Sequence, residues 1–226
     1  MKDVLKARSY YYEFASSALT FYEDETKFTN MKEQIKELAK FPITDENKAD
    51  FESMNEFTFK QFKDEQNALF FNLSYSNTPT TASFYDEGRD NGKARLDVIN
   101  IIKKSKYRRD EKTCKEGEDF IGFIFGLMAT FLQDEANNGI QNDLSAELFK
   151  TSINNFIDEF LDMITSSKYA VFYKSYANIM RNFITLERSL LDVVAPIKTR
   201  SEAKIAIDKK SYIAELRDSG EDLTDY

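Results

Sequence analysis

The chain contains no histidine and only one cysteine, Cys114, among its 226 residues. The missing histidine excludes Ser-His-Asp and Cys-His nucleophilic sites, H-E-x-x-H zinc sites and the Glu-x-x-His motif of di-iron bundles. A single cysteine cannot form an internal disulfide, and Cys114 lies among charged residues, so we expect an ordinary surface thiol in a reducing compartment. We therefore expect no catalytic residue, no metal site, no cofactor and no enzymatic activity.

Glycine, proline and long apolar runs are also scarce. Seven Gly and three Pro are too few for the frequent turns of an all-β sandwich. The longest nearly uncharged apolar segment, Phe120 to Leu132, is shorter than the about 18 residues or more that a membrane span requires. Residues 1–6 lack the apolar run of a secretory signal. These absences predict a soluble, cytoplasmic protein.

Basic residues are outnumbered, and the formal net charge is −8. Generic nucleic-acid binding is therefore disfavoured, because neutralising phosphates requires a basic face. The basic cluster from Lys103 to Lys112 is the one feature that points toward phosphate or nucleotide. Acidic residues interrupt it and no glycine-rich phosphate loop accompanies it, so a solvated charged linker is the favoured interpretation.

Apolar residues make up 42% of the chain and aromatic residues 14%, and most recur at helical rather than alternating spacing. This pattern predicts an all-α fold, with Gly88 and Gly92 weakening one helix in its middle. The expected helices cover roughly residues 4–22, 30–40, 46–55, 58–71, 83–102, 118–132, 148–164, 169–190 and 201–217. Aromatic stripes at this spacing, such as Phe156 and Phe160, are most simply core residues.

The charged stretch in mid-chain suggests a division into parts. We predict an N-terminal helical lobe at 1–103, a charged linker or hinge at 104–117, and a C-terminal helical lobe at 118–195. Residues 196–226 would form a last helix and an acidic tail. We expect a monomer, with a dimer that exchanges lobes through the linker as the alternative.

Three separated motifs follow one another between Glu65 and Leu132. The first is Glu65-Gln66-Asn67-Ala68-Leu69-Phe70, which closes an apolar-periodic helix. The second, Pro79-Thr80-Thr81-Ala82-Ser83-Phe84-Tyr85, follows a turn-rich loop. The third, Glu118-Asp119-Phe120-Ile121, opens the most apolar helix of the chain. Together they resemble the E-Y-x-x-L-F, P-x(n)-S-x-Y and D-H-[IL]-x-x-x-[LF]-x-F-M-x-x-L patterns of the TorD/DmsD/NarJ family.

That resemblance implies an all-helical protein of about 8–11 helices in two packed lobes, and a chaperone rather than an enzyme. Such chaperones bind the twin-arginine signal peptide, or another apo segment, of the precursor of a molybdopterin oxidoreductase catalytic subunit before export. Formate dehydrogenase is the client suggested first, followed by reductases of N- or S-oxides and of nitrate. No nucleic acid and no stable membrane insertion are implied.

Carried over by position, the peptide-binding residues implied by the resemblance are Glu65, Phe70, Pro79, Ser83, Tyr85, Asp119 and Phe120. Two positions depart from the family pattern. Phe120 stands where the family usually has His, so contacts made by that His would be absent or replaced by stacking on Phe120. Gln66 stands where an aromatic residue is common.

Each of these residues also has a structural interpretation. Glu65 could be a solvated helix residue, Pro79 could stiffen a turn and Tyr85 could pack with a solvated hydroxyl. Asp119 could be a helix N-cap, a role that contributes about 1 kcal/mol. Two other functions stay open: a general helical adaptor that binds partner helices and, less favoured, a carboxylate-based hydrolase.

Overall fold

The computed structural model describes residues 1–22, 24–71, 77–112, 114–140 and 142–209. In these ranges the chain forms helices connected by turns and longer loops, and its one β-like feature is an isolated antiparallel bridge between Thr81 and Phe120. The prediction of an all-α fold is confirmed. The helices are α1 (Lys2–Leu19), α2 (Glu25–Leu38), α3 (Asp45–Asn55), α4 (Phe59–Gln66), α5 (Ala82–Glu87), α6 (Lys93–Lys104), α7 (Ile121–Asn138), α8 (Leu144–Leu148), α9 (Asn154–Ser166) and α10 (Phe172–Leu191), with π-helical segments η1 (Asn67–Phe71) and η2 (Phe149–Ile153).

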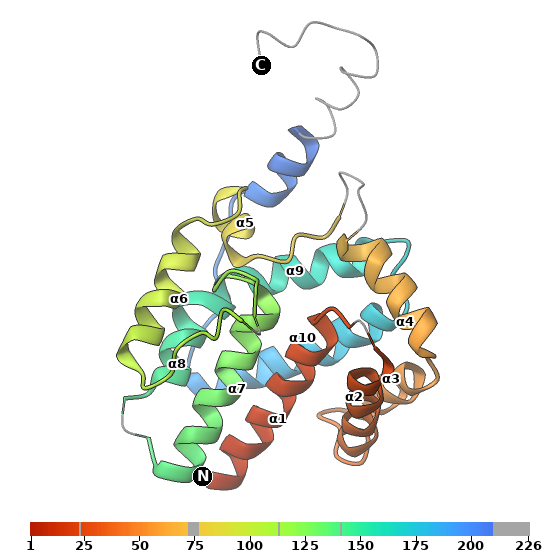
Figure 1. Cartoon of the computed structure of the whole chain (residues 1–226), viewed down its shortest axis with the longest axis horizontal. Coiled ribbons are helices and arrows are strands. Elements are labelled where there is room, and N and C mark those ends of the chain that lie inside the picture. The colour runs from red at the N-terminus through yellow and green to blue at the C-terminus, as the bar shows by residue number, and fades with distance from the viewer. Residues whose placement is uncertain (23, 72–76, 113, 141, 210–226) are drawn as a thin grey trace, which may run out of the picture.

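Helix α1 lies along α7, and this is the most extensive helix pairing of the molecule (Figure 1). Small residues permit it, because a Cβ at Gly126 would lie 3.2 Å from Ser16 Oγ. Ser16 also donates to the carbonyl of Gly122 over 2.7 Å. Helix α10 packs against α3 and α9 on the other side of α1.

Two helix boundaries have clear local causes. Helix α2 begins at Glu25, earlier than the expected Asn30, because Asp24 Oδ1 accepts the Thr26 N–H over 2.9 Å and caps it. The expected weak point at Gly88 is a real break between α5 and α6, where Gly88 has a φ of 67°. Only glycine adopts that conformation freely, and a Cβ would also approach the carbonyl oxygen of Glu202 to 3.1 Å.

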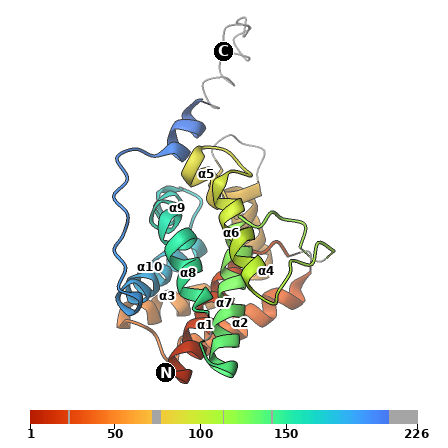
Figure 2. The same ribbon diagram turned by 90° about the vertical axis from the view of Figure 1, so that its left-hand side faces the viewer.

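After α10 the chain runs in an extended course to a further helical stretch at 202–209 (Figure 2). Lys198 Nζ bonds to Glu159 Oε2 over 3.0 Å and to the Tyr85 carbonyl over 2.9 Å, and Ala203 is fully buried. The C-terminal segment is thus fastened onto α5 and α9. The rest of the expected last helix and the acidic tail lie outside the described residues.

The hydrophobic core is continuous from α1 to α10. At its centre Arg8 of α1 forms two bonds to Glu187 of α10, of 2.5 and 2.9 Å, and Tyr12 donates to the same carboxylate over 3.0 Å. Elements from before and after the 104–117 linker therefore pack directly together. The division into lobes at that linker stays a prediction.

Candidate functional site

The three sequence motifs are joined by backbone hydrogen bonds. Thr78, the residue just before the second motif, donates its N–H to the carbonyl of Leu69 in the first motif over 2.9 Å. Ala82 N–H donates to Asp119 over 2.8 Å and Ile121 N–H to Thr80 over 2.9 Å, which links the second motif to the third. The motif residues are therefore neighbours in the fold although up to about 50 positions separate them in sequence.

Glu65 is buried, so the alternative interpretation of a solvated helix residue is wrong. Its Oε1 accepts the N–H groups of Val171 over 2.8 Å and Tyr173 over 2.9 Å, and its Oε2 accepts that of Phe172 over 3.0 Å. These donors are the unpaired N–H groups at the start of α10. Burial raises the pKa of the Glu65 carboxyl, and the three N–H bonds oppose that rise. In this conformation Glu65 caps a distant helix.

Gln66 and Phe70 also serve packing. Gln66 is 1% exposed, and its Nε2 donates to the Thr20 carbonyl over 3.0 Å, at the C-terminal end of α1. The amide thus satisfies a helix end, which an aromatic ring at this position cannot do. Phe70 packs edge-on against Tyr173, with ring centroids 4.9 Å apart.

The second motif is likewise internal. Tyr85 is 1% exposed, and its hydroxyl donates to the Pro79 carbonyl over 2.7 Å rather than being solvated. Burial raises the pKa of Tyr85 well above its ordinary value. Ser83 is fully buried, and its Oγ has no hydrogen-bond partner among the described residues. Pro79 is partly exposed.

Asp119 does not cap α7. That helix begins at Ile121 with Phe120 at the N-cap position and no side-chain cap bond. Asp119 is 1% exposed, and its Oδ2 has no hydrogen-bond partner within the described part of the chain. The N-cap expectation was wrong because the backbone of Asp119 pairs with Ala82 across the isolated bridge, one residue before the cap position.

Phe120 lines a surface groove. A Cβ at Gly122 would lie 2.6 Å from Phe120 Cε1, so the ring occupies the space that Gly122 leaves open. As peptide-binding residues, all seven predicted positions stay predictions. Six of them do not line this groove, which is formed by Phe120 and its neighbours.

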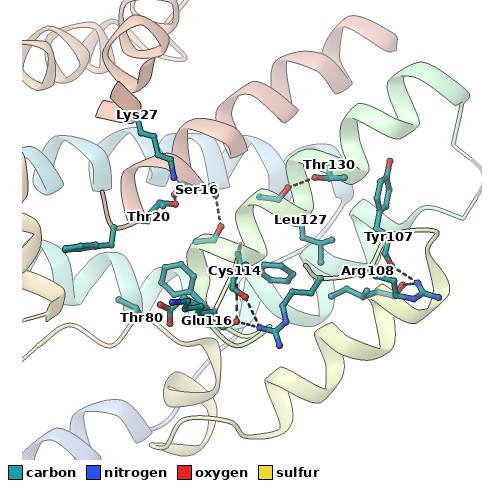
Figure 3. A pocket seen from close by; sticks show the side chains of 18 of the residues that line it. Ser16, Thr20, Lys27, Thr80, Tyr107, Arg108, Cys114, Glu116, Leu127 and Thr130 are labelled. Atoms are coloured by element: carbon teal, nitrogen blue, oxygen red, sulfur yellow. Dashed lines mark hydrogen bonds between the residues drawn. The ribbon is translucent and has the colours of Figure 1, made fainter. Parts of the chain in front are cut away.

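This groove, called the aromatic groove below, lies between the end of α1, one face of α7 and the 105–116 segment, with a cavity volume of about 630 Å³ (Figure 3). Its apolar lining is formed by Phe21, Phe71, Ile102, Phe120, Phe123 and Leu127. Phe21 and Phe71 remain 45% and 40% exposed and meet edge-to-face with ring centroids 5.4 Å apart. Exposed aromatic pairs beside a cavity are typical of protein-binding surfaces.

This groove was not predicted from the sequence, although the spacing of two glycines points to it. Gly122 and Gly126 are four residues apart on α7, and small residues at that spacing let a second helix approach closely. The outer wall was interpreted as a solvated linker. In the fold, Arg109 anchors that wall by bonding to Glu118 over 2.9 Å and to the Glu116 carbonyl over 2.6 Å.

Glu118 connects this wall of the groove to α6. Glu118 Oε2 accepts a hydrogen bond from Arg95 Nε of α6 over 2.7 Å, and Oε1 forms an ion pair with Arg109, whose Nε lies 2.9 Å away. Burial raises the pKa of the Glu118 carboxyl, but the Arg95 hydrogen bond and the two guanidinium charges outweigh it and hold the pKa below its ordinary value. The linker is thus fastened to α6 through a shared carboxylate.

A second groove, called the acidic groove, adjoins the first between α1 and α2 and has a cavity volume of about 510 Å³. Glu13, Glu33 and Glu37 line it beside Tyr10 and Tyr22. Burial and the charges of Glu37 and Glu13 raise the pKa of Tyr10, as expected in a negative potential. The two grooves share Thr20 and Lys27, so one extended ligand can contact both.

The described ranges contain neither a candidate metal site nor a candidate membrane span. No group of three or more Cys, Asp and Glu residues there could hold a metal ion. None of the helices in the same ranges combines the length and the apolar character needed to cross a bilayer.

The fold and the three joined motifs define an all-helical protein of the molybdoenzyme-chaperone class. The family described as nitrate reductase delta subunit matches residues 23–162, which contain all three motifs and extend from α2 through most of α9. The chain belongs to this family, whose members are non-catalytic chaperones that mature molybdoenzymes. The resemblance to the TorD/DmsD/NarJ proteins is thereby confirmed. No curated protein matches the chain.

Proposed function

We propose that the protein is a cytoplasmic chaperone that binds the twin-arginine signal peptide of a molybdopterin oxidoreductase precursor until that client has matured for export. Family membership supports the chaperone role. The observation that supports the signal peptide as ligand is the contact between an acidic groove and an aromatic groove. A twin-arginine peptide has the matching order, two guanidiniums followed by an apolar run.

In the proposed complex the two arginines lie against Glu13 and Glu37 and the apolar run lies in the aromatic groove. Glu13 is exposed and, within the described part of the chain, forms no ion pair. Glu37 pairs with Lys40 over 2.6 Å on an exposed helix face, a bond that a guanidinium can replace at little cost. Formate dehydrogenase stays one candidate client beside the other molybdopterin oxidoreductases.

Calorimetric titration with a synthetic peptide tests this proposal. A peptide with two adjacent arginines and an apolar run should bind at micromolar affinity or tighter, about −8 kcal/mol. Replacing both arginines by glutamine, or both Glu13 and Glu37 by Gln, should weaken binding roughly threefold to tenfold, since each exposed ion pair contributes about 0.2–1 kcal/mol. Glu52→Gln on α3, an exposed acid outside both grooves, is the matched control.

Lys27 provides a second test, in which a substitution should strengthen binding instead of weakening it. It lies where the two grooves meet, and its positive charge repels an arginine in the acidic groove. Lys27→Gln should therefore tighten binding of the arginine peptide and leave the glutamine peptide unchanged. If the arginine and glutamine peptides bind with equal affinity in every variant, recognition of the two arginines is excluded. The function of a general helical adaptor would then explain the binding better.

A further inference from the structure

The charge around the aromatic groove is opposite to that of the whole chain. The protein carries a formal net charge of −8. The described residues that line this groove nevertheless include four cations, Lys27, Arg108, Arg109 and Lys115, and one anion, Glu116. The groove therefore combines an aromatic floor with a positive rim, in a protein that is otherwise acidic.

The charges of the rim are not equally available. Arg109 is neutralised by Glu118 and also bonds to Glu111 over 3.2 Å. Lys115, like Lys27, forms no ion pair in the described part of the chain, and its side chain is exposed. The positive charge at the outer wall thus comes from Lys115 and from Arg108.

Arg108 is held in position without being neutralised. Its Nη1 donates to the carbonyls of Tyr107 over 2.5 Å and Ser105 over 2.9 Å, which are uncharged acceptors. Among the described residues its Nε and Nη2 have no partner. A guanidinium fixed by one nitrogen, with two others available, is arranged to receive a carboxylate through two hydrogen bonds. In Figure 3 Arg108 lies at the wall of the groove beside Tyr107.

We propose that the segment bound in the aromatic groove carries one or more carboxylates next to its apolar residues, and that Arg108 and Lys115 bind them. The occupant is a part of the client polypeptide, which rests on the proposed chaperone function. Apolar side chains of that segment contact Phe71, Phe120 and Phe123, while its carboxylates pair with the outer wall. The protein then recognises client charges of both signs: arginines bind in the acidic groove, and carboxylates bind at this rim.

Four peptides distinguish this inference from the proposed function. Three contain two arginines and an apolar run and end in Asp-Glu, Asn-Gln or Lys-Lys, and the fourth has the apolar run and Asp-Glu without arginines. Wild-type protein should bind the Asp-Glu peptide about fivefold to tenfold tighter than the Asn-Gln peptide, and the Lys-Lys peptide weakest. Combining Arg108→Gln with Lys115→Gln should abolish these differences. Lys103→Gln, an exposed lysine of the same basic cluster outside the groove, should preserve them.

Cys114 reports where the peptides bind. It is the single cysteine of the chain and lies half-buried in the wall of the groove, so a maleimide modifies one known position. The fourth peptide should slow this modification in wild-type protein, and should lose that protection in the Arg108 and Lys115 double variant.

Equal binding of the Asp-Glu and Asn-Gln peptides would overturn the inference while leaving the twin-arginine proposal intact. If the fourth peptide protects Cys114 while the two arginines do not change peptide affinity, the twin-arginine proposal would be overturned and the inference would stand. Failure of all four peptides would overturn both.

Discussion

At the scale of single residues, Glu65 illustrates how a motif position can serve a fold. Its carboxylate accepts three backbone N–H groups at the start of α10, a helix more than 100 residues away in sequence. A carboxylate can do this because it offers two acceptor oxygens and no competing donor. The residue is buried by the helix it caps, which explains why it does not face solvent.

Glu65→Gln should lower the free energy of unfolding by about 1–3 kcal/mol. The amide offers one acceptor oxygen, and its NH₂ group would face a backbone donor, so at least one N–H at the start of α10 loses its partner. The midpoint of urea unfolding measures the loss. Asp64→Asn, which removes an exposed pair with Lys60 on the same helix, should change stability by less than about 0.5 kcal/mol. A Glu65→Gln midpoint equal to that of wild type would contradict the capping role.

Gly122 is a second residue whose role can be tested, by adding a single Cβ atom. Gly122→Ala should turn the Phe120 ring away from its position, because the new Cβ would stand 2.6 Å from Phe120 Cε1. The aromatic groove would change shape, and affinity for an apolar peptide should fall about threefold or more. The same substitution in a Phe120→Leu background should have a smaller effect, since the two residues are in contact. Additive effects of the two changes would show that the clash is not the cause.

At the scale of secondary-structure elements, the 105–116 segment is a wall fastened by ion pairs. Arg95 of α6 and Arg109 share the carboxylate of Glu118. Because the folded-state pKa of Glu118 lies below its ordinary value of 4.5, the ionised form stabilises the fold. That contribution is complete above about pH 4.5 and is lost as the pH falls through the depressed pKa.

The difference in melting temperature between wild type and Glu118→Gln should therefore be largest near pH 6 and shrink toward zero below pH 4. Melting curves across this range, followed by circular dichroism, measure it. The comparison isolates Glu118 because both proteins contain the same other carboxyl groups. A difference that stays constant with pH would mean that the charge of Glu118 does not hold the wall.

At the scale of the whole molecule, α1 and α10 are joined through a buried ion pair. Arg8 on α1 and Glu187 on α10 are 9% and 0% exposed in their side chains. Burial lowers the pKa of Arg8, but the bonds to Glu187 outweigh it and raise the pKa above its ordinary value. Arg8 is therefore charged in the folded protein.

Glu187→Gln should destabilise the protein by about 3–5 kcal/mol, because it leaves the Arg8 charge buried without a counter-ion. Replacing both residues, Arg8→Met with Glu187→Leu, should cost much less than the single change. Urea unfolding of the two variants provides the comparison. If the double variant were the less stable one, the bonds would contribute more than the cost of burying the charges.

Much of the fold could be predicted from the sequence, because helical periodicity and glycine breaks act locally. The apolar spacing predicted α1, α3 and α10 to within three residues and the start of α7 as closely, although α7 continues six residues beyond the expected end at 132. Gly88 marked the break after α5. Periodicity was less reliable at the edges of elements. Leu96 and Tyr169 continue the apolar spacing of the expected helices at 83–102 and 169–190, yet their side chains are 60% and 51% exposed.

For the candidate site, the sequence and the tertiary structure contributed different information. The sequence by itself determined the family and the helices, and it excluded histidine chemistry, since motifs and composition need no coordinates. Only the tertiary structure decided which motif residues are accessible. It turned Glu65 and Tyr85 inward and joined α1, α7 and the 105–116 segment around an aromatic groove with a positive rim. Burial and groove shape depend on contacts between residues that are far apart in the chain, and no local pattern records which of those contacts form.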